Sequence, residues 1–140
     1  MTDLGWMRRW IGVMTGRALR AEFARQGVPA GQAVVFDEAT AVALIHRSEE
    51  EYVAVASVEP IPEKDLSGYD APRGHSMKDE ERLRSWSSAR EFVESLAGRD
   101  LYFDVIFESS LATYLARFRY LARTGAAWSR KGAGSGNSVQ

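Results

Sequence analysis

Apolar residues recur at helical spacing over the first part of the chain. Between residues 3 and 26, one stripe follows the i, i+3, i+4 positions of a helix that faces a core. It comprises Leu4, Met7, Trp10, Ile11, Met14, Ala18 and Ala21. A second face has two glycines one turn apart, which would let another backbone approach closely. It comprises Gly12, Gly16, Leu19 and Phe23. The pattern predicts a helix over residues 3–26 that ends at Gly27.

A turn over residues 28–31 separates this helix from three short β patterns. They cover residues 33–36, 41–47 and 52–58. The polar residues 48–51 suit a hairpin loop between the last two. The middle segment also fits a helix over residues 38–46, which Asp37 would cap. The strand is the favoured interpretation of this segment, and the helix is the alternative.

Residues 59–78 form a polar stretch interrupted by proline and glycine, which predicts a long loop. A helical segment follows and ends at Gly98. Ser76 with Asp79, and Ser88 with Glu91, have capping-box spacing, so the segment is either one kinked helix or two short helices. Its predicted buried residues are Leu83, Trp86, Ala89, Phe92, Val93 and Leu96.

The last two elements have the clearest patterns. Apolar and other residues alternate over residues 101–108, as in a strand with one wholly apolar face. Ser109 or Ser110 then caps a helix that runs to Gly125. Its apolar stripe, predicted to face the core, comprises Leu111, Tyr114, Leu115, Phe118, Leu121 and Ala122. Residues 129–140 contain little that could pack and predict a flexible polar tail.

This order of elements predicts an α+β fold. We expect a small antiparallel or mixed sheet of three to four strands, packed against N-terminal, middle and C-terminal helices. Residues 1–128 would form a single domain, since a chain of 140 residues is close to the usual size for one core.

The net charge of −1 hides an uneven distribution. Residues 1–34 have five Arg and two acidic residues, residues 35–110 have eight basic and seventeen acidic residues, and residues 111–140 have five basic residues and no acidic one. An acidic centre between basic ends bears on association with partners more than on the fold.

The N-terminus and the absence of cysteine exclude several classes of protein. Asp3, Arg8 and Arg9 interrupt the first apolar run, so neither a secretory signal nor a membrane span is predicted. A chain without cysteine cannot form disulfides, thiolate metal sites or a cysteine nucleophile. This composition favours a cytoplasmic location.

The two histidines are the candidates for chemistry. His75 has Asp70, Asp79 and Glu80 nearby in sequence, and these are ligand types for a divalent metal. Their spacing matches no standard motif, and a solvated loop explains them more simply. His46 beside Arg47 is explained as a half-exposed residue. We therefore predict no catalytic residue, no metal site and no cofactor, with a small metal- or His-dependent enzyme as the second alternative.

The residue types enriched at interfaces gather at the two ends of the chain. The predicted protein interface, which would also support homo-oligomers, comprises Trp6, Trp10, Gly12, Gly16, Leu19 and Phe23. The alternative is a nucleic-acid surface, because cations beside an aromatic ring can follow phosphates and stack a base. It comprises Arg117, Arg119, Tyr120, Arg123, Arg130 and Lys131. Peripheral membrane contact is disfavoured, because Leu19 and Phe23 interrupt the polar face of the first helix.

An amphipathic helix leading into residues 32–37, 40–47 and 51–62 resembles the opening of small type III secretion chaperones. The resemblance implies a dimeric α+β protein that wraps an extended client. It ends in the second half of the chain, where that family has further paired strands before its last helix. The sequence as a whole predicts a non-catalytic protein-binding module, such as an adaptor, an inhibitor or a small chaperone.

Overall fold

The computed structural model describes residues 15–72 and 77–124 of the chain. Within these ranges there are four α-helices, two short 3₁₀ helices and four strands. In chain order they are α2 (Gly16–Phe23), η1 (Ala24–Gln26), β1 (Val28–Ala30), β2 (Ala33–Val35), α3 (Glu38–Glu50), β3 (Val55–Pro62), η2 (Glu63–Asp65), α4 (Asp79–Ser95), β4 (Leu101–Phe107) and α5 (Ser110–Thr124). The predicted α+β class is confirmed.

The strands pair in two antiparallel ribbons that one bridge joins. β1 pairs with β2, and β3 pairs with β4. Phe36, just after β2, exchanges two backbone hydrogen bonds of 2.9 and 2.7 Å with Phe103 of β4. The predicted small sheet is thus confirmed in part, because its strands are antiparallel but divide between two ribbons.

β3 is an edge strand, with no strand neighbour except β4 in the described residues. Its Pro60 lies opposite Phe103, whose backbone groups are directed toward Phe36. In an antiparallel ladder, a residue opposite such a position also directs its backbone outward. Pro60, and by alternation Pro62, therefore lie where a strand tolerates proline, with the backbone nitrogen on the open side.

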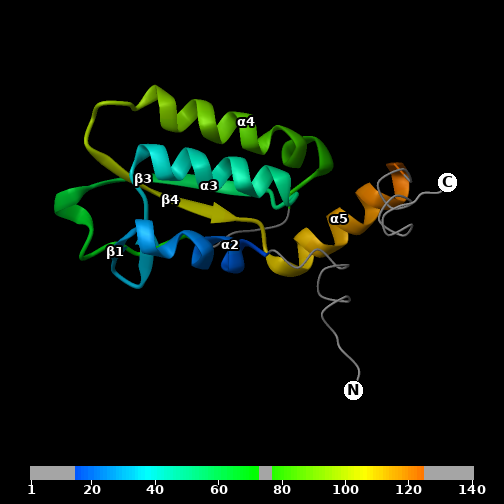
Figure 1. Ribbon diagram of the computed structural model, residues 1–140, viewed down its shortest axis with the longest axis horizontal. Helices are drawn as coiled ribbons and strands as arrows, with labels where there is room; N and C mark the ends of the chain where they lie inside the picture. Colours follow the sequence, from blue (N-terminus) through cyan, green and yellow to red (C-terminus); the bar gives the residue numbers. More distant parts are fainter. Residues whose placement is uncertain (1–14, 73–76, 125–140) are drawn as a thin grey trace, which may run out of the picture.

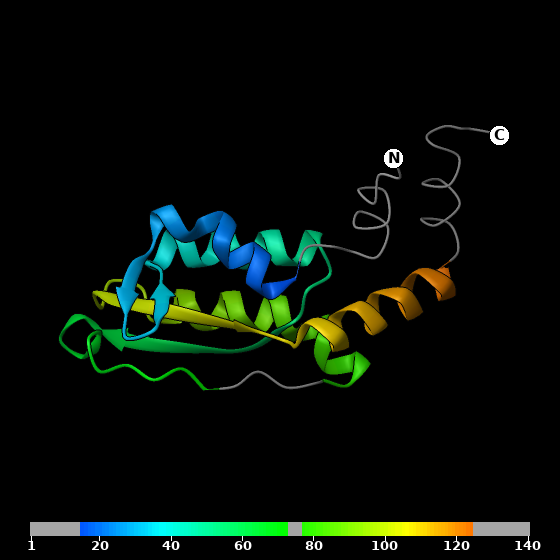
Figure 2. The same ribbon diagram turned by 90° about the horizontal axis from the view of Figure 1, so that it is seen from below.

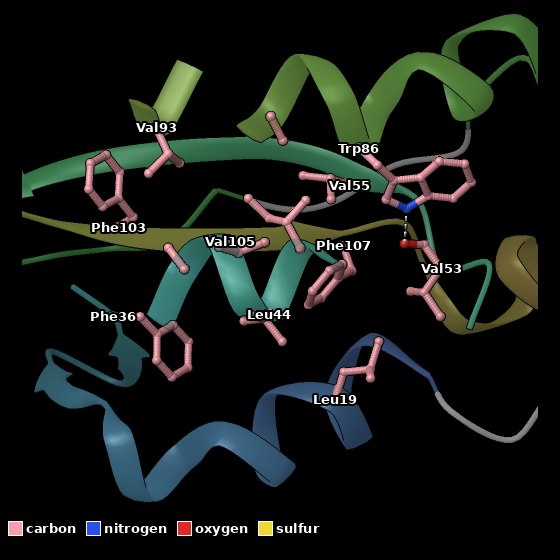
Figure 3. Close-up of a cluster of buried hydrophobic side chains, with 13 residues drawn as sticks. Leu19, Phe36, Leu44, Val53, Val55, Trp86, Val93, Phe103, Val105 and Phe107 are labelled. Atoms are coloured by element: carbon pink, nitrogen blue, oxygen red, sulfur yellow. Dashed lines mark hydrogen bonds between the residues drawn. The ribbon is translucent and has the colours of Figure 1, made fainter. Parts of the chain in front are cut away.

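Helices α2, α3 and α4 cover one face of the β3–β4 ribbon, with α3 and α4 side by side (Figure 1). The main core lies between these layers (Figure 3). Its buried residues are Leu19, Phe36, Ala41, Leu44, Ile45, Val53, Val55, Trp86, Ala89, Val93, Phe103, Val105 and Phe107. The indole Nε1 of Trp86 donates a 2.9 Å hydrogen bond to the carbonyl of Val53, so this large side chain is buried without an unpaired donor.

Helix α2 begins later than the sequence pattern predicts. Thr15 has an extended backbone (φ −91°, ψ 169°), and its hydroxyl accepts a 3.2 Å hydrogen bond from the backbone of Ala18. A single helix over residues 3–26 is therefore wrong, because Thr15 caps a new one. The predicted core face is also wrong for α2, since Leu19 is fully buried and Ala21 is exposed. Gly16 does allow a close approach, to β4: a side chain there would begin 2.5 Å from Cβ of Phe107.

The segment favoured as a second strand is a helix. α3 spans Glu38–Glu50, and Asp37 accepts a 2.9 Å hydrogen bond from the backbone of Thr40. Its buried residues recur at helical spacing: Ala41, Leu44, Ile45 and Ser48. The predicted hairpin around residues 48–51 is thus also wrong. The first residues of the predicted turn over residues 28–31 are instead strand β1, and the left-handed Gly31 (φ 58°) makes the turn to β2.

The predicted long loop is shorter than expected, and the helix after it is continuous. β3 runs to Pro62 and η2 follows it. α4 is one helix from Asp79, and the carboxylate of Glu81 accepts a 2.9 Å hydrogen bond from the backbone of Lys78 at its start. Leu83 and Phe92, predicted to be buried, are 51% and 40% exposed. The buried face instead contains Arg82, Ser85, Trp86, Ala89 and Val93.

Candidate functional site

Helix α5 leaves the end of β4 and runs away from the sheet and from α2 and α3 (Figures 1 and 2). The hydroxyl of Ser109 accepts a 3.3 Å hydrogen bond from the backbone of Ala112, which caps the first turn as predicted. The described buried residues of α5 are Thr113 and Ala116, and Arg117 and Tyr120 are partly buried on the same face. This face contacts the rest of the domain.

Charged and aromatic contacts hold α5 in place. Arg117 donates a 2.7 Å hydrogen bond to the carbonyl of Glu51, and its guanidinium lies 3.7 Å from the carboxylate of the same residue. Arg119 and Arg123 pair with Asp79 at 3.4 and 3.3 Å. Hydrogen bonds from Arg123, and then from Arg119, lower the pKa of Asp79. The polar side of α5 is therefore its attachment side.

Tyr52 completes the attachment. Its ring stacks on Tyr120 of α5 with centroids 4.7 Å apart, and it contacts Trp86 of the core at 5.5 Å. The backbone of Tyr52 is left-handed (φ 58°), a conformation that is uncommon for a residue other than glycine. Such backbone strain persists only where surrounding contacts compensate for it. Here the two ring contacts place α5 against the end of α3.

The apolar stripe of α5 faces away from the domain. Leu111 is 67% exposed, Leu115 is 44% exposed and Phe118 is 46% exposed, while Tyr114 is partly buried and contacts the ring of Phe118. The prediction that this stripe faces the core is wrong, because the contacts through Arg117 and Tyr120 turn the helix the other way. We call Leu111, Leu115, Phe118 and Ala122 the outer face of α5.

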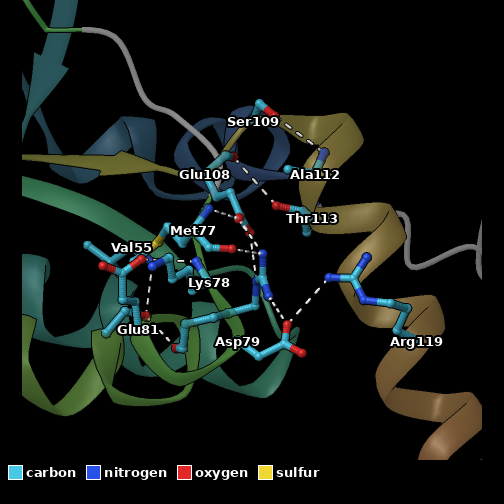
Figure 4. A network of polar contacts seen from close by, with 12 residues as sticks. Val55, Met77, Lys78, Asp79, Glu81, Glu108, Ser109, Ala112, Thr113 and Arg119 are labelled. Carbon is cyan, nitrogen blue, oxygen red and sulfur yellow. Dashed lines mark hydrogen bonds and ion pairs between the residues drawn. The ribbon is translucent and has the colours of Figure 1, made fainter.

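A buried ion pair lies beneath the start of α5 (Figure 4). Arg82 of α4 is 2% exposed, and its Nη2 and Nε lie 2.6 and 3.0 Å from the carboxylate of Glu108. The same carboxylate accepts a 2.9 Å hydrogen bond from the backbone of Met77. The hydrogen bonds that Arg82 donates to Glu108 raise the pKa of the Arg82 guanidinium. Arg82 also pairs with Asp79 at 2.7 Å, which connects this pair to the attachment of α5.

A second buried carboxylate, Asp104, lies on β4, the strand that ends just before Glu108. Nη2 of Arg20 lies 2.9 Å from its Oδ1, with geometry too poor for a hydrogen bond, so this contact is an electrostatic one. The hydroxyl of Tyr69 donates a 2.6 Å hydrogen bond to Oδ2. Arg20 also donates to the carbonyls of Val34 and Val105 at 2.8 and 3.4 Å. These contacts fill the space between β2 and β4 beyond their single bridge.

An open groove of about 770 Å³ runs beside this second pair, between α2 and residues 69–71. Apolar residues of β4, Ile106 and Phe107, line it together with the polar side chains of Arg17, Arg20 and Gln32. Every buried charge near it is already paired within the protein. Among the described residues that line the groove, no buried charged side chain is left unpaired, whereas Arg17 is exposed and has no ion pair with a described residue.

The contacts of Tyr69 predict a stability that depends on alkaline pH. Burial, and then the hydrogen bond to Asp104, raise the pKa of the Tyr69 hydroxyl. Above pH about 10 the unfolded chain loses this proton and the folded chain keeps it, so the free energy of unfolding should fall as the pH rises. Each such group contributes about 1.4 kcal/mol per pH unit in that range. Below pH about 10 its contribution is fully present.

Tyr69→Phe should therefore reduce this slope, as measured by urea unfolding between pH 8 and pH 11. Burial also raises the pKa of Tyr52, so part of the slope should remain. An unchanged slope in the Tyr69→Phe variant would contradict the prediction.

The described residues of the predicted protein interface are buried in the chain's own core or pack against it. Gly16 and Leu19 are buried in the chain's own core, and Phe23 packs against that core. Trp6, Trp10 and Gly12 lie outside the described residues. Sequence reasoning assigned Leu111 and Leu115 to the core instead. The exposed position of these two residues could be found only from the polar contacts on the other side of α5, which involve residues distant in sequence.

The predicted nucleic-acid residues are partly brought together. Arg117, Arg119, Tyr120 and Arg123 all lie on α5, but each has a partner within the protein: Glu51, Asp79 or Tyr52. Arg130 and Lys131 lie outside the described residues, as does the predicted tail over residues 129–140.

The histidine candidates are not brought together with ligands. His75 lies outside the described residues. Asp79, one of its predicted neighbours, is paired with Arg82, Arg119 and Arg123. His46 is exposed and lies 3.7 Å from Glu50 on α3. In residues 15–72 and 77–124, no group of three acidic or histidine side chains could hold a metal ion.

No family model matches the chain, and neither do any of the curated proteins or solved structures with which it was compared. None of the helices in the described ranges has the length and hydropathy that crossing a membrane requires.

Proposed function

We propose that the chain is a non-catalytic protein-binding module, of the adaptor, inhibitor or small-chaperone kind, which binds through the outer face of α5. One observation carries this proposal: polar contacts hold the helix on the domain, while Leu111 and Leu115 face away from it. A contiguous apolar face on an exposed helix typically marks an interaction site. The protein presents such a face on an element that its own contacts fix in place.

The charges beside the outer face indicate the chemistry of the partner. Arg119 and Arg123 flank it, are 54% and 57% exposed at the side chain, and share the single carboxylate of Asp79. Two cations paired with one acid leave positive charge along this side of the helix. The partner proposed here is an amphipathic segment with apolar anchors and neighbouring acidic residues, because both parts would complement α5.

This proposal moves the interface from the first helix to the last. The burial of Leu19 makes it a core residue, whereas Leu111 has the exposure that a contact residue needs. Self-association through the predicted N-terminal helix and a cytoplasmic location stay predictions from the sequence.

The nucleic-acid alternative has less support. Tyr120 stacks on Tyr52, so this face of its ring is not available for a base. Arg117 is directed into the domain, where it bonds to the carbonyl of Glu51. Arg119 and Arg123 would have to give up part of their pairing with Asp79 to bind phosphates.

Introducing charge on the outer face tests the proposal. Leu111→Asp combined with Leu115→Asp should weaken binding to a purified partner by at least about tenfold, because burying one leucine contributes roughly 1.5–3 kcal/mol. Candidate partners would be captured with the wild-type chain, identified by mass spectrometry, purified and titrated by calorimetry.

Leu83→Asp is the matched control. Leu83 is also an exposed leucine on a helix, but it lies on α4. It should leave the affinity within about twofold of wild type, which is the usual range for a substitution outside the interface. Equal losses in both variants, or no loss in the α5 variant, would refute the proposal.

A further inference from the structure

A second groove, of about 360 Å³, lies between the first half of β3 and α4. On the strand side it is lined by four consecutive residues, 55–58. On the helix side its lining residues recur at helical spacing, from Glu81 through Ser85 and Ser88 to Phe92. One edge of the ribbon and one face of a helix therefore bound the same space, and no described residue of α5 lines it.

The groove follows the direction of both elements. β3 and α4 run the same way, because the chain passes from the end of α4 into the start of β4, which lies opposite the end of β3 (Figure 1). The hydroxyl of Ser85 accepts a 3.2 Å hydrogen bond from the backbone of Val55, so these residues are level with each other. Three strand residues and seven helix residues both span about 10 Å, which brings Phe92 level with Val58.

The strand edge beside the groove has unpaired backbone groups. Val58 lies two residues before Pro60, so by alternation it also directs its backbone away from β4. Outside the β3–β4 ladder, no hydrogen bond between described residues involves Val58. Its N–H and carbonyl, together with the carbonyl of Pro60, therefore offer one donor and two acceptors to a strand on the open side. Val55 differs, because Ser85 already accepts its N–H.

The helix side of the groove suits an apolar side chain at this level. On an added antiparallel strand, the residue opposite Val58 would exchange two hydrogen bonds with it and direct its side chain to the same face. That face is the one covered by the helices, since Val58 packs against the main core. The side chain would therefore meet α4 where Ala89 is small and Phe92 is 40% exposed.

The other end of the groove suits an acidic side chain. Arg84 lines it, is exposed and has no ion pair with a described residue. Glu81, the other charged residue of the lining, already accepts the backbone hydrogen bond from Lys78. On the added strand, the residue two positions after the apolar one would lie about 7 Å nearer to this end, with its side chain on the same face. A carboxylate there would complement Arg84.

We propose that the groove between β3 and α4 binds an extended segment of another protein as an added antiparallel strand. The segment has an apolar residue opposite Val58 and an acidic residue two positions later. Strand addition of this kind takes affinity from the main chain and specificity from alternate side chains. The site is independent of the outer face of α5 and so goes beyond the function proposed above. A second copy of β3 is a poorer occupant, because Pro60 follows Val58 at the position where the acid is required.

Selection from a random ten-residue peptide library, displayed on phage, tests this site with the full chain as bait. The enriched peptides should share a large apolar residue followed two positions later by Asp or Glu. One of them, synthesised with a fluorescent label, would be titrated by anisotropy. Ser88→Tyr should weaken its binding at least about tenfold, because the ring would occupy the groove. Ser87→Tyr is the matched control: Ser87 is exposed on the same helix but does not line the groove, so the affinity should stay within about twofold.

Modified peptides test the main-chain contacts on the unaltered protein, so this result does not depend on how a variant folds. N-methylation of the apolar residue removes the donor to the carbonyl of Val58 and should weaken binding at least about fivefold. N-methylation of the next residue, whose N–H faces away from β3, should change it less than about twofold. Arg84→Glu should reverse the preference between the acidic peptide and its lysine analogue.

Several results would overturn the inference. They are a selection without a consensus, equal losses for the two N-methylated peptides, and binding that survives Ser88→Tyr. Binding lost in the variant with both Leu111→Asp and Leu115→Asp, but kept in Ser88→Tyr, would assign the peptide to the outer face of α5. That result would refute the strand site and leave the proposed function intact. Backbone NMR shifts at Val58 that grow with protein concentration, and that Ser88→Tyr abolishes, would assign the edge to a second copy and refute the proposal.

Discussion

Arg82→Leu should lower the free energy of unfolding by about 3–5 kcal/mol, because it leaves the buried carboxylate of Glu108 without its cation. Glu108 has no exposed side-chain surface and would keep only the backbone hydrogen bond from Met77. Arg82 also holds the carbonyl of Met77 at 2.8 Å, so the chain leading into α4 would lose a contact too. Urea unfolding, followed by circular dichroism, measures the loss.

Arg84→Leu is the matched control, since Arg84 is an exposed arginine on the same helix. It should change the free energy of unfolding by less than about 0.5 kcal/mol. Replacing both partners, by Arg82→Leu with Glu108→Leu, should recover much of the lost stability, because no buried charge is then left unpaired. If Arg82→Leu alone were as stable as wild type, the buried pair would not have the role assigned to it.

Arg20→Met should lower the free energy of unfolding by about 3 kcal/mol, which is at the lower end of the range for breaking a buried ion pair. Asp104 is fully buried, but the side chain of Arg20 is 24% exposed, so water can replace part of what the guanidinium provides. The carbonyls of Val34 and Val105 would lose a donor at the same time. We expect the hydrogen bond from Tyr69 to remain, so the fold should persist with a lower unfolding midpoint.

Arg17→Met provides the comparison for this substitution. Arg17 lies on the same helix and beside the same groove, but it is exposed and has no ion pair with a described residue. Its replacement should leave the urea midpoint almost unchanged. Equal midpoints for the two variants would mean that Asp104 does not depend on Arg20.

The pattern of the sequence predicts which segments are regular better than it predicts where their faces point. The alternation over residues 101–108 identified β4, and the apolar stripe identified α5. The same stripe does not show which way α5 faces. Its orientation depends on contacts with Glu51, Tyr52 and Asp79, which are distant from α5 in sequence. A periodic pattern predicts the type of one element, but it does not predict which other elements that element contacts.

Two other errors have local and distant causes. Residues 38–50 form a helix, which is consistent with the spacing of Ala41, Leu44 and Ile45 and with the cap at Asp37. The short apolar run in this segment also fits a strand, and run length alone does not distinguish the two. For α4, Arg82 occupies a buried position because its partner Glu108 lies directly after β4, 26 residues further along the chain. No local pattern distinguishes that arginine from Arg84, which remains exposed.

The two prolines of β3 limit how molecules of this protein can associate. An open strand edge recruits a strand from another molecule through its backbone N–H groups, and this edge lacks that donor at both Pro60 and Pro62. Growth of the sheet from copy to copy is thereby blocked along the second half of β3. At high concentration, contacts between molecules should therefore run through side chains of the helices, and the protein should resist assembly into fibrils seeded by its own edge.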